Sequence, residues 1–182
     1  PPSPPSAASQ PRTDYRPLSR IGPIQGTTRR SAVELSGLIA DDHAGTTRLY
    51  DARVDYAHTA AYLTAELVEP PRLLFVAQLI RTGRPQFVSG ATLVVATETE
   101  QVRVPLDGVV ERESAGALLR EALVVKVNPD MLPALAAVAG AEDVRVEFEG
   151  ISETYHHQLT KNEQAAMANL LVAFIDLGGV VR

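Results

Sequence analysis

The last third of the chain constrains the fold most, because a strand pattern there passes directly into a helix pattern. Val144, Val146 and Phe148 alternate with charged side chains, which is the period of a strand with one buried face. Gly150 follows, and the alternation continues over residues 151–159. The two segments therefore predict an antiparallel hairpin.

A helix is predicted directly after this hairpin. Residues 160–163 read Thr-Lys-Asn-Glu, the capping box in which the Thr and Glu side chains satisfy the first free backbone amides. The helix is expected to run to about Leu177 and to end at Gly178 and Gly179. It should bury a broad apolar face made of Met167, Ala168, Leu170, Leu171, Phe174 and Ile175.

Strand patterns also recur upstream. Residues 72–81 enclose LLFVAQLI, an apolar run without alternation, which favours a central strand covered on both faces. Residues 91–97 and 101–106 predict a second hairpin. Residues 60–69 fit either a strand or a short helix. The remaining strands are expected at 33–39, 50–56 and 122–127.

Two connections carry turn or cap signals. The sequence Asp-Asp-His-Ala-Gly at 41–45 predicts a turn after the first strand. A short helix is expected over 131–139, with Asn128 or Asp130 as its cap and Gly140 at its end.

These patterns together predict the α+β class. We expect a mainly antiparallel β-sheet of about six to eight strands. The C-terminal amphipathic helix and the shorter helix should pack on one of its faces. Residues 32–182 should form a single domain, with 1–31 as a disordered tether and linker.

The ending just described resembles the ends of uncharacterised exported bacterial proteins and lipoproteins. The resemblance covers about the last third of the chain and rests on the short helix, the hairpin and the capped helix. It implies an exported protein and brings no activity and no site residues with it.

The first ten residues, PPSPPSAASQ, point in the same direction. They contain no initiator Met, no apolar segment and no charge, and seven prolines occur in the first 23 residues. We expect a processed, exported protein at the periplasmic or outer surface, anchored through an acylated Cys lost just before Pro1. A chain trimmed for expression is the alternative.

Charge is divided unevenly along the chain. Residues 1–30 carry five Arg and one Asp, a net charge of +4, so the remaining residues carry −9 of the total of −5. An acidic body argues against nucleic acid as a partner. The basic front is expected either to bind an anionic membrane surface or acidic partner, or to fold back on its own acidic domain.

Histidines and acidic turns are the first candidates for a metal site. His156 and His157 are adjacent, so on a strand their rings point to opposite faces and cannot share one ion. We expect His157 to be largely buried and His156 largely exposed. The acidic turn at 41–45 lacks the ligand spacing of a calcium loop, and the absence of cysteine excludes thiolate ligands. No metal or cofactor is expected.

Other chemistry-bearing residues do not form a recognisable catalytic set. Glu111, Glu113 and Glu121 are too scattered for an acid/base pair, and Ser89-Gly90 lacks the rest of a nucleophile elbow. Tyr50, Tyr56 and Tyr62 recur six residues apart. They would share a face on one continuous strand, but we favour ordinary core and hairpin packing. We therefore expect no catalytic, cofactor-binding or metal-binding residues.

The function expected from these features is binding rather than catalysis. We predict a non-enzymatic accessory or scaffold protein of the bacterial cell envelope, lipid-anchored, that binds another protein through a sheet edge or loops. The alternative is a carrier of a small ligand or lipid, with a cavity between helix and sheet.

Overall fold

The computed structural model describes residues 37–43, 45–83 and 85–182. The predicted tether at 1–31, and most of the strand predicted at 33–39, lie outside these residues.

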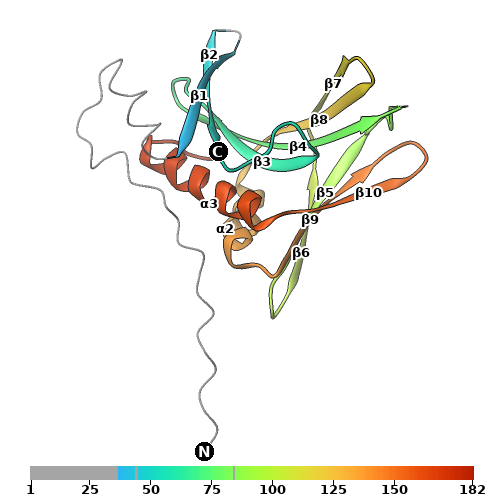
Figure 1. Cartoon of the computed structure of the whole chain (residues 1–182). Coiled ribbons are helices and arrows are strands. Elements are labelled where there is room, and N and C mark those ends of the chain that lie inside the picture. The colour runs from blue at the N-terminus through green and yellow to red at the C-terminus, as the bar shows by residue number, and fades with distance from the viewer. Residues whose placement is uncertain (1–36, 44, 84) are drawn as a thin grey trace, which may run out of the picture.

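Two antiparallel sheets make up most of the described fold (Figure 1). The six-stranded sheet has the order β1-β2-β3-β4-β8-β7. Its strands are β1 (Leu38–His43), β2 (Thr46–Asp51), β3 (Ala60–Glu66), β4 (Arg72–Thr82), β8 (Leu118–Lys126) and β7 (Val109–Ala115). The four-stranded sheet has the order β10-β9-β5-β6. Its strands are β10 (Thr154–Gln158), β9 (Asp143–Glu149), β5 (Gly90–Ala96) and β6 (Gln101–Leu106).

Helices occur in two parts of the described chain, between β8 and β9 and at the C-terminus. Between β8 and β9 the chain forms η2 (Pro129–Met131), α2 (Leu132–Ala137) and η3 (Val138–Gly140). Asn128 caps the first of them by accepting a hydrogen bond from the Met131 amide. The C-terminal helix α3 (Lys161–Asp176) begins with the predicted capping box, in which Thr160 and Glu163 each bond the other's backbone amide.

A single apolar core joins these elements. Phe75 and Leu123 from the six-stranded sheet, Phe148 from the four-stranded sheet, and Leu170 and Phe174 from α3 are all at most 1% exposed and belong to one cluster. The α+β class, mainly antiparallel and packed by a C-terminal helix and a shorter one, is therefore confirmed. No helix in the described ranges has both the length and the apolarity needed to cross a membrane.

The strand predicted at 50–56 is wrong after Asp51, where β2 ends. The Asp51 carboxylate accepts a hydrogen bond from the Arg53 amide at 3.0 Å, which turns the chain away from the sheet. The turn predicted at 41–45 is also shorter than expected. β1 continues to His43, which pairs with Thr46, and Gly45 supplies the positive φ of the tight connection.

The structure differs from the sequence analysis in β7 and in the buried face of α3. β7 was not predicted, because most of its side chains are exposed and its sequence shows no apolar alternation. Ile175 of α3 is 61% exposed, and Ala166 and Ala173 are buried instead. The helix is turned this way because Glu163 is itself buried against β3. β4 is central, as predicted, and its side chains from Leu73 to Leu79 are buried on both faces.

Candidate functional site

The uncovered face of the six-stranded sheet forms a trough. The sheet is strongly curved, with β1–β2 and β7–β8 rising on either side of β3 and β4, while α3 lies on the opposite face (Figure 1). No helix or strand of the described residues is drawn over the inside of this curve in Figure 1, and two pockets open on this face. We call this concave face the trough. Its floor is apolar and tightly packed, with Thr64, Leu74, Val76 and Ala122 at most 9% exposed.

One end of the trough is a pocket walled by tyrosines. This tyrosine pocket has a volume of about 400 Å³ and is lined by Ile39, Ala40, Asp41, Tyr50, Tyr56, Tyr62, Gln78 and Arg120. The three tyrosines come from β2, the following loop and β3, not from one continuous strand. Ring centroids lie 5.5 Å apart for Tyr50 and Tyr56 and 4.8 Å apart for Tyr56 and Tyr62, both edge to face. This geometry is the favourable one for aromatic pairs.

Gln78 fixes the shape of the tyrosine pocket. Its amide nitrogen donates to the carbonyl oxygens of Tyr56 and His58 at 3.0 and 2.6 Å, which holds the loop between β2 and β3 against β4. Its carbonyl oxygen accepts from the Tyr62 hydroxyl at 3.4 Å and from Arg120 Nε at 3.2 Å. Because Gln78 is 1% exposed and bonded on both sides, the pocket is built before any ligand arrives.

Tyr56 and Tyr62 act as neutral groups in this pocket. Burial raises the pKa of Tyr56, and it also raises the pKa of Tyr62 even though Arg120 lies close to that phenol. Tyr56 donates its hydroxyl proton to the Asp51 carbonyl at 2.8 Å. The pocket therefore offers aromatic faces, the Arg120 guanidinium and the Asp41 carboxylate, a surface suited to binding.

The other end of the trough is lined by charges. This charged pocket has a volume of about 440 Å³ and is lined by Arg48, Glu66, Arg72, Leu74, Val109, Glu111, Val124 and Lys126. Arg48 and Glu66 form an ion pair at 2.8 Å across β2 and β3. The two pockets share β3, where Tyr62 and Glu66 stand on one face four residues apart, about 13 Å along the strand. They are therefore neighbouring parts of one surface.

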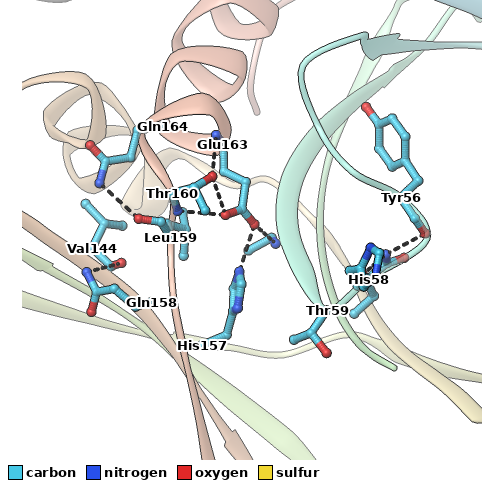
Figure 2. A network of polar contacts seen from close by, with 12 residues as sticks. Tyr56, His58, Thr59, Val144, His157, Gln158, Leu159, Thr160, Glu163 and Gln164 are labelled. Carbon is cyan, nitrogen blue, oxygen red and sulfur yellow. Dashed lines mark hydrogen bonds and ion pairs between the residues drawn. The ribbon is translucent and has the colours of Figure 1, made fainter. Parts of the chain in front are cut away.

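A second polar cluster surrounds Glu163 and joins α3 to both sheets (Figure 2). Glu163 Oε1 lies 2.8 Å from His157 Nε2 of β10 and accepts from the Ala61 amide of β3 at 2.9 Å. Oε2 accepts from the Thr160 amide and hydroxyl at 2.7 and 2.8 Å. Because the carboxylate only accepts, His157 Nε2 carries the proton in this contact.

These donors decide the charge of Glu163. Burial by itself would raise the pKa of the carboxyl group, but the hydrogen bonds from His157, Thr160 and Ala61 outweigh it and hold the pKa below its ordinary value. Glu163 is therefore an ionised, fully bonded group inside the molecule. The cluster joins α3 to β3 and β10.

The predicted difference in exposure between His156 and His157 is confirmed. The side chain of His157 is 17% exposed and faces Glu163, whereas that of His156 is 58% exposed and lies 3.9 Å from Glu147. No group of three or more His, Cys, Asp or Glu able to hold a metal ion occurs within the described ranges.

The remaining candidates lie apart from one another. Glu111 faces the charged pocket, and Glu113 pairs with Arg120 at 3.4 Å, across β7 and β8. Glu121 points to the other face, is 4% exposed, and accepts from Arg112 and from the amides of residues 86 and 88. Ser89 donates to the Glu149 carbonyl at 3.1 Å. These residues are not brought together into one site.

Asp41 and Asp42 take different places on β1. Asp41 lies on the wall of the tyrosine pocket, and Asp42 accepts from the Thr47 hydroxyl at 2.7 Å. Sequence reasoning missed Gln78 and Arg120. Gln78 is the single polar residue in LLFVAQLI, and that interruption of a central strand was the available signal.

Comparison of the chain with protein-family models, with curated protein sequences and with solved structures gives no match. The trough is therefore the feature of this chain that bears most directly on function.

Proposed function

We propose that this protein is a non-enzymatic binding module that holds an extended segment of a partner protein in the trough. The observation that carries the proposal is the uncovered concave sheet face with a pre-built tyrosine pocket at one end. Tyrosine rings supply large contact area at low cost in conformational entropy. A surface of this kind favours binding over catalysis.

The dimensions of the trough favour an extended peptide. An extended chain advances about 3 Å per residue, so four or five residues span the distance between the two pockets. An apolar floor between charged walls suits a chain with alternating apolar and polar side chains. A partner segment of roughly eight residues would cover both pockets.

The setting of this module is part of the same proposal. A lipid-anchored accessory or scaffold protein of the cell envelope would present its trough to a neighbouring protein near the membrane. The support for this setting is the composition of the first residues, PPSPPSAASQ. Sequencing the gene upstream of Pro1 tests it, since a lipobox cysteine is expected there.

A carrier of a small ligand or lipid is the second candidate. A pocket of about 270 Å³ lies at the end of α3, lined by Leu73, Val127, Phe174, Val180 and Val181 among others. It is smaller than the tyrosine pocket and lies where helix and sheet meet. Binding of a fatty acid there, lost on Phe174→Ala, would favour the carrier.

The test of the peptide-binding proposal uses a displayed library of random dodecapeptides selected on the full chain. Selected peptides are expected to bind with a Kd of about 10–100 µM. Tyr50→Ala should weaken them at least about ten-fold, because Tyr50 is half-buried and presents its ring to the pocket.

Tyr155→Ala is the matched control. Tyr155 lies in β10 and packs against Arg81 at 4.1 Å, outside the trough, so its removal should leave the affinity unchanged. Selected peptides that bind the Tyr50 variant as tightly as the original chain would overturn the proposal, and so would a library that yields no binder.

A further inference from the structure

We propose that the proline- and arginine-containing sequence at residues 11–23 of this chain is a ligand of the trough and competes there with the partner. The inference rests on the proposed function, because it names what regulates that same surface. The sequence reads PRTDYRPLSRIGP. It lies before the described residues, and the proposal is carried by its chemistry and by where it joins the fold.

The first step is the match between proline and the tyrosine pocket. Proline-rich segments favour an extended backbone without internal hydrogen bonds, and they bind to grooves lined by aromatic side chains. The edge-to-face rings of Tyr50, Tyr56 and Tyr62 form such a groove. Arg120, beside them, is a donor for the carbonyl groups that such a segment leaves unbonded.

The second step is charge. Arg16 and Arg20 flank Pro17, and the first 30 residues carry a net charge of +4 against −9 for the rest. Three carboxylates line the trough, Asp41 in the tyrosine pocket and Glu66 and Glu111 in the charged pocket, beside four cationic side chains. Glu66 is paired with Arg48, whereas within the described part of the chain neither Asp41 nor Glu111 has an ion-pair partner. These two carboxylates complement the two arginines.

The third step is the point of attachment. The described chain begins at Gly37, and β1 follows at once and supplies Ile39, Ala40 and Asp41 to the wall of the tyrosine pocket. Residues 24–36 can reach about 40 Å when extended. Tethering at such a distance gives an effective concentration of about 1 mM, so a peptide of Kd about 0.2 mM would occupy the trough roughly 80% of the time.

Two alternatives have to be distinguished from this proposal. The same segment of a second chain could occupy the trough, or the trough could stay empty. Because residues 1–182 contain no cysteine, Ser19→Cys gives one specific site for a nitroxide label in this chain. Amide signals of β2, β3 and β8 are expected to lose at least half of their intensity beside the label, with those of β6 unchanged. A mixture of labelled, isotope-silent chains with unlabelled, isotope-rich chains should show no such loss.

A triple variant and a matched control test whether Arg16, Pro17 and Arg20 cause the loss of amide signal. Arg16→Ser, Pro17→Ser and Arg20→Ser together should abolish the broadening, whereas Arg29→Ser with Arg30→Ser, which also removes two positive charges, should leave it. Broadening that covers both sheets equally, or that survives the triple variant, would overturn the proposal. Broadening in the mixed sample would overturn it in favour of a second copy.

A titration separates this inference from the proposed function. A fluorescein-labelled peptide of residues 11–23 is expected to bind the triple variant about five-fold more tightly than the original chain, because the tethered copy no longer competes. Equal binding to both would overturn competition and leave the trough a peptide-binding site. No binding to either, or binding that Tyr50→Ala does not weaken, would overturn the tyrosine pocket as the site for this sequence.

Discussion

Three carboxylates inside the molecule are each held by several donors. Asp51 is bonded by Arg53 and by Asn169 at 3.0 Å, Glu121 by Arg112 and two amides, and Glu163 by His157, Thr160 and Ala61. A buried charge is tolerated only when it is bonded in this way. Each carboxylate ties together segments that are distant in the sequence, so each is expected to matter for stability.

Glu163 gives the protein a defined acid sensitivity. Because its pKa is lowered in the folded protein, its stabilisation is complete above the ordinary value of 4.5 and is lost as the pH falls through the folded value. Glu163→Gln should cost on the order of 2 kcal/mol at pH 7. Urea unfolding between pH 7 and 3 should show that the variant loses less stability on acidification; an unchanged slope would contradict the assignment.

Added zinc should leave the melting temperature unchanged. The rings of His156 and His157 lie on opposite faces of β10, and the described chain places no third ligand beside either. A native-state ligand would raise the melting temperature. A rise that disappears in a variant carrying His156→Ala and His157→Ala would refute this prediction.

The C-terminal helix α3 packs on one face of the six-stranded sheet. It contacts β3 and β2 along a face that contains Met167, Leu170 and Phe174, each at most 1% exposed. The capping box sets the rotation of this face, because the same Glu163 that caps the helix also reaches β3. Cap and packing therefore stabilise one orientation.

Substitutions along α3 should follow this orientation. Leu170→Ala should cost about 3 kcal/mol, since it leaves a cavity in the core. Thr160→Ala should cost about 1 kcal/mol through the lost cap. Ile175→Ala should be nearly neutral, because Ile175 is 61% exposed. Equal losses at Leu170 and Ile175 in chemical denaturation would mean that the helix faces another way.

Elements with strong local signals were predictable from the sequence, and the trough was not. The hairpin at 144–159, the capping box and the short helix after Asn128 each depend on residues close together in the chain. The tyrosine pocket needs Gln78 and Arg120 to meet, which follows from the pairing of β4 with β8 across about 40 residues. That pairing leaves no periodic signal, and β7 beside it shows almost none.

The six-stranded and the four-stranded sheet share one hydrophobic core. The same cluster contains Phe75 of β4, Phe148 of β9 and Leu170 of α3. A common core predicts cooperative unfolding of residues 38–182 as one unit.

Hydrogen exchange tests this unity. Phe148→Ala, which removes a large buried side chain from the four-stranded sheet, should lower the protection of β4 amides as much as that of β9 amides. Tyr50→Ala, a change in the trough, is the control and should lower both by less. Loss of protection confined to β9 would show that the sheets unfold separately.

The hydrogen bond from the Ala61 amide to Glu163 also has a consequence for synthesis. Its two ends are 102 residues apart, and the whole of β3 and β4 is translated before α3 begins. Translation proceeds at about 5–20 residues per second, so several seconds pass between the synthesis of β3 and the synthesis of α3, which covers it. A chain that ends before Lys161 lacks α3. Its apolar side chains Ala61, Leu63 and Ala65 are then expected to be exposed to solvent, which promotes aggregation.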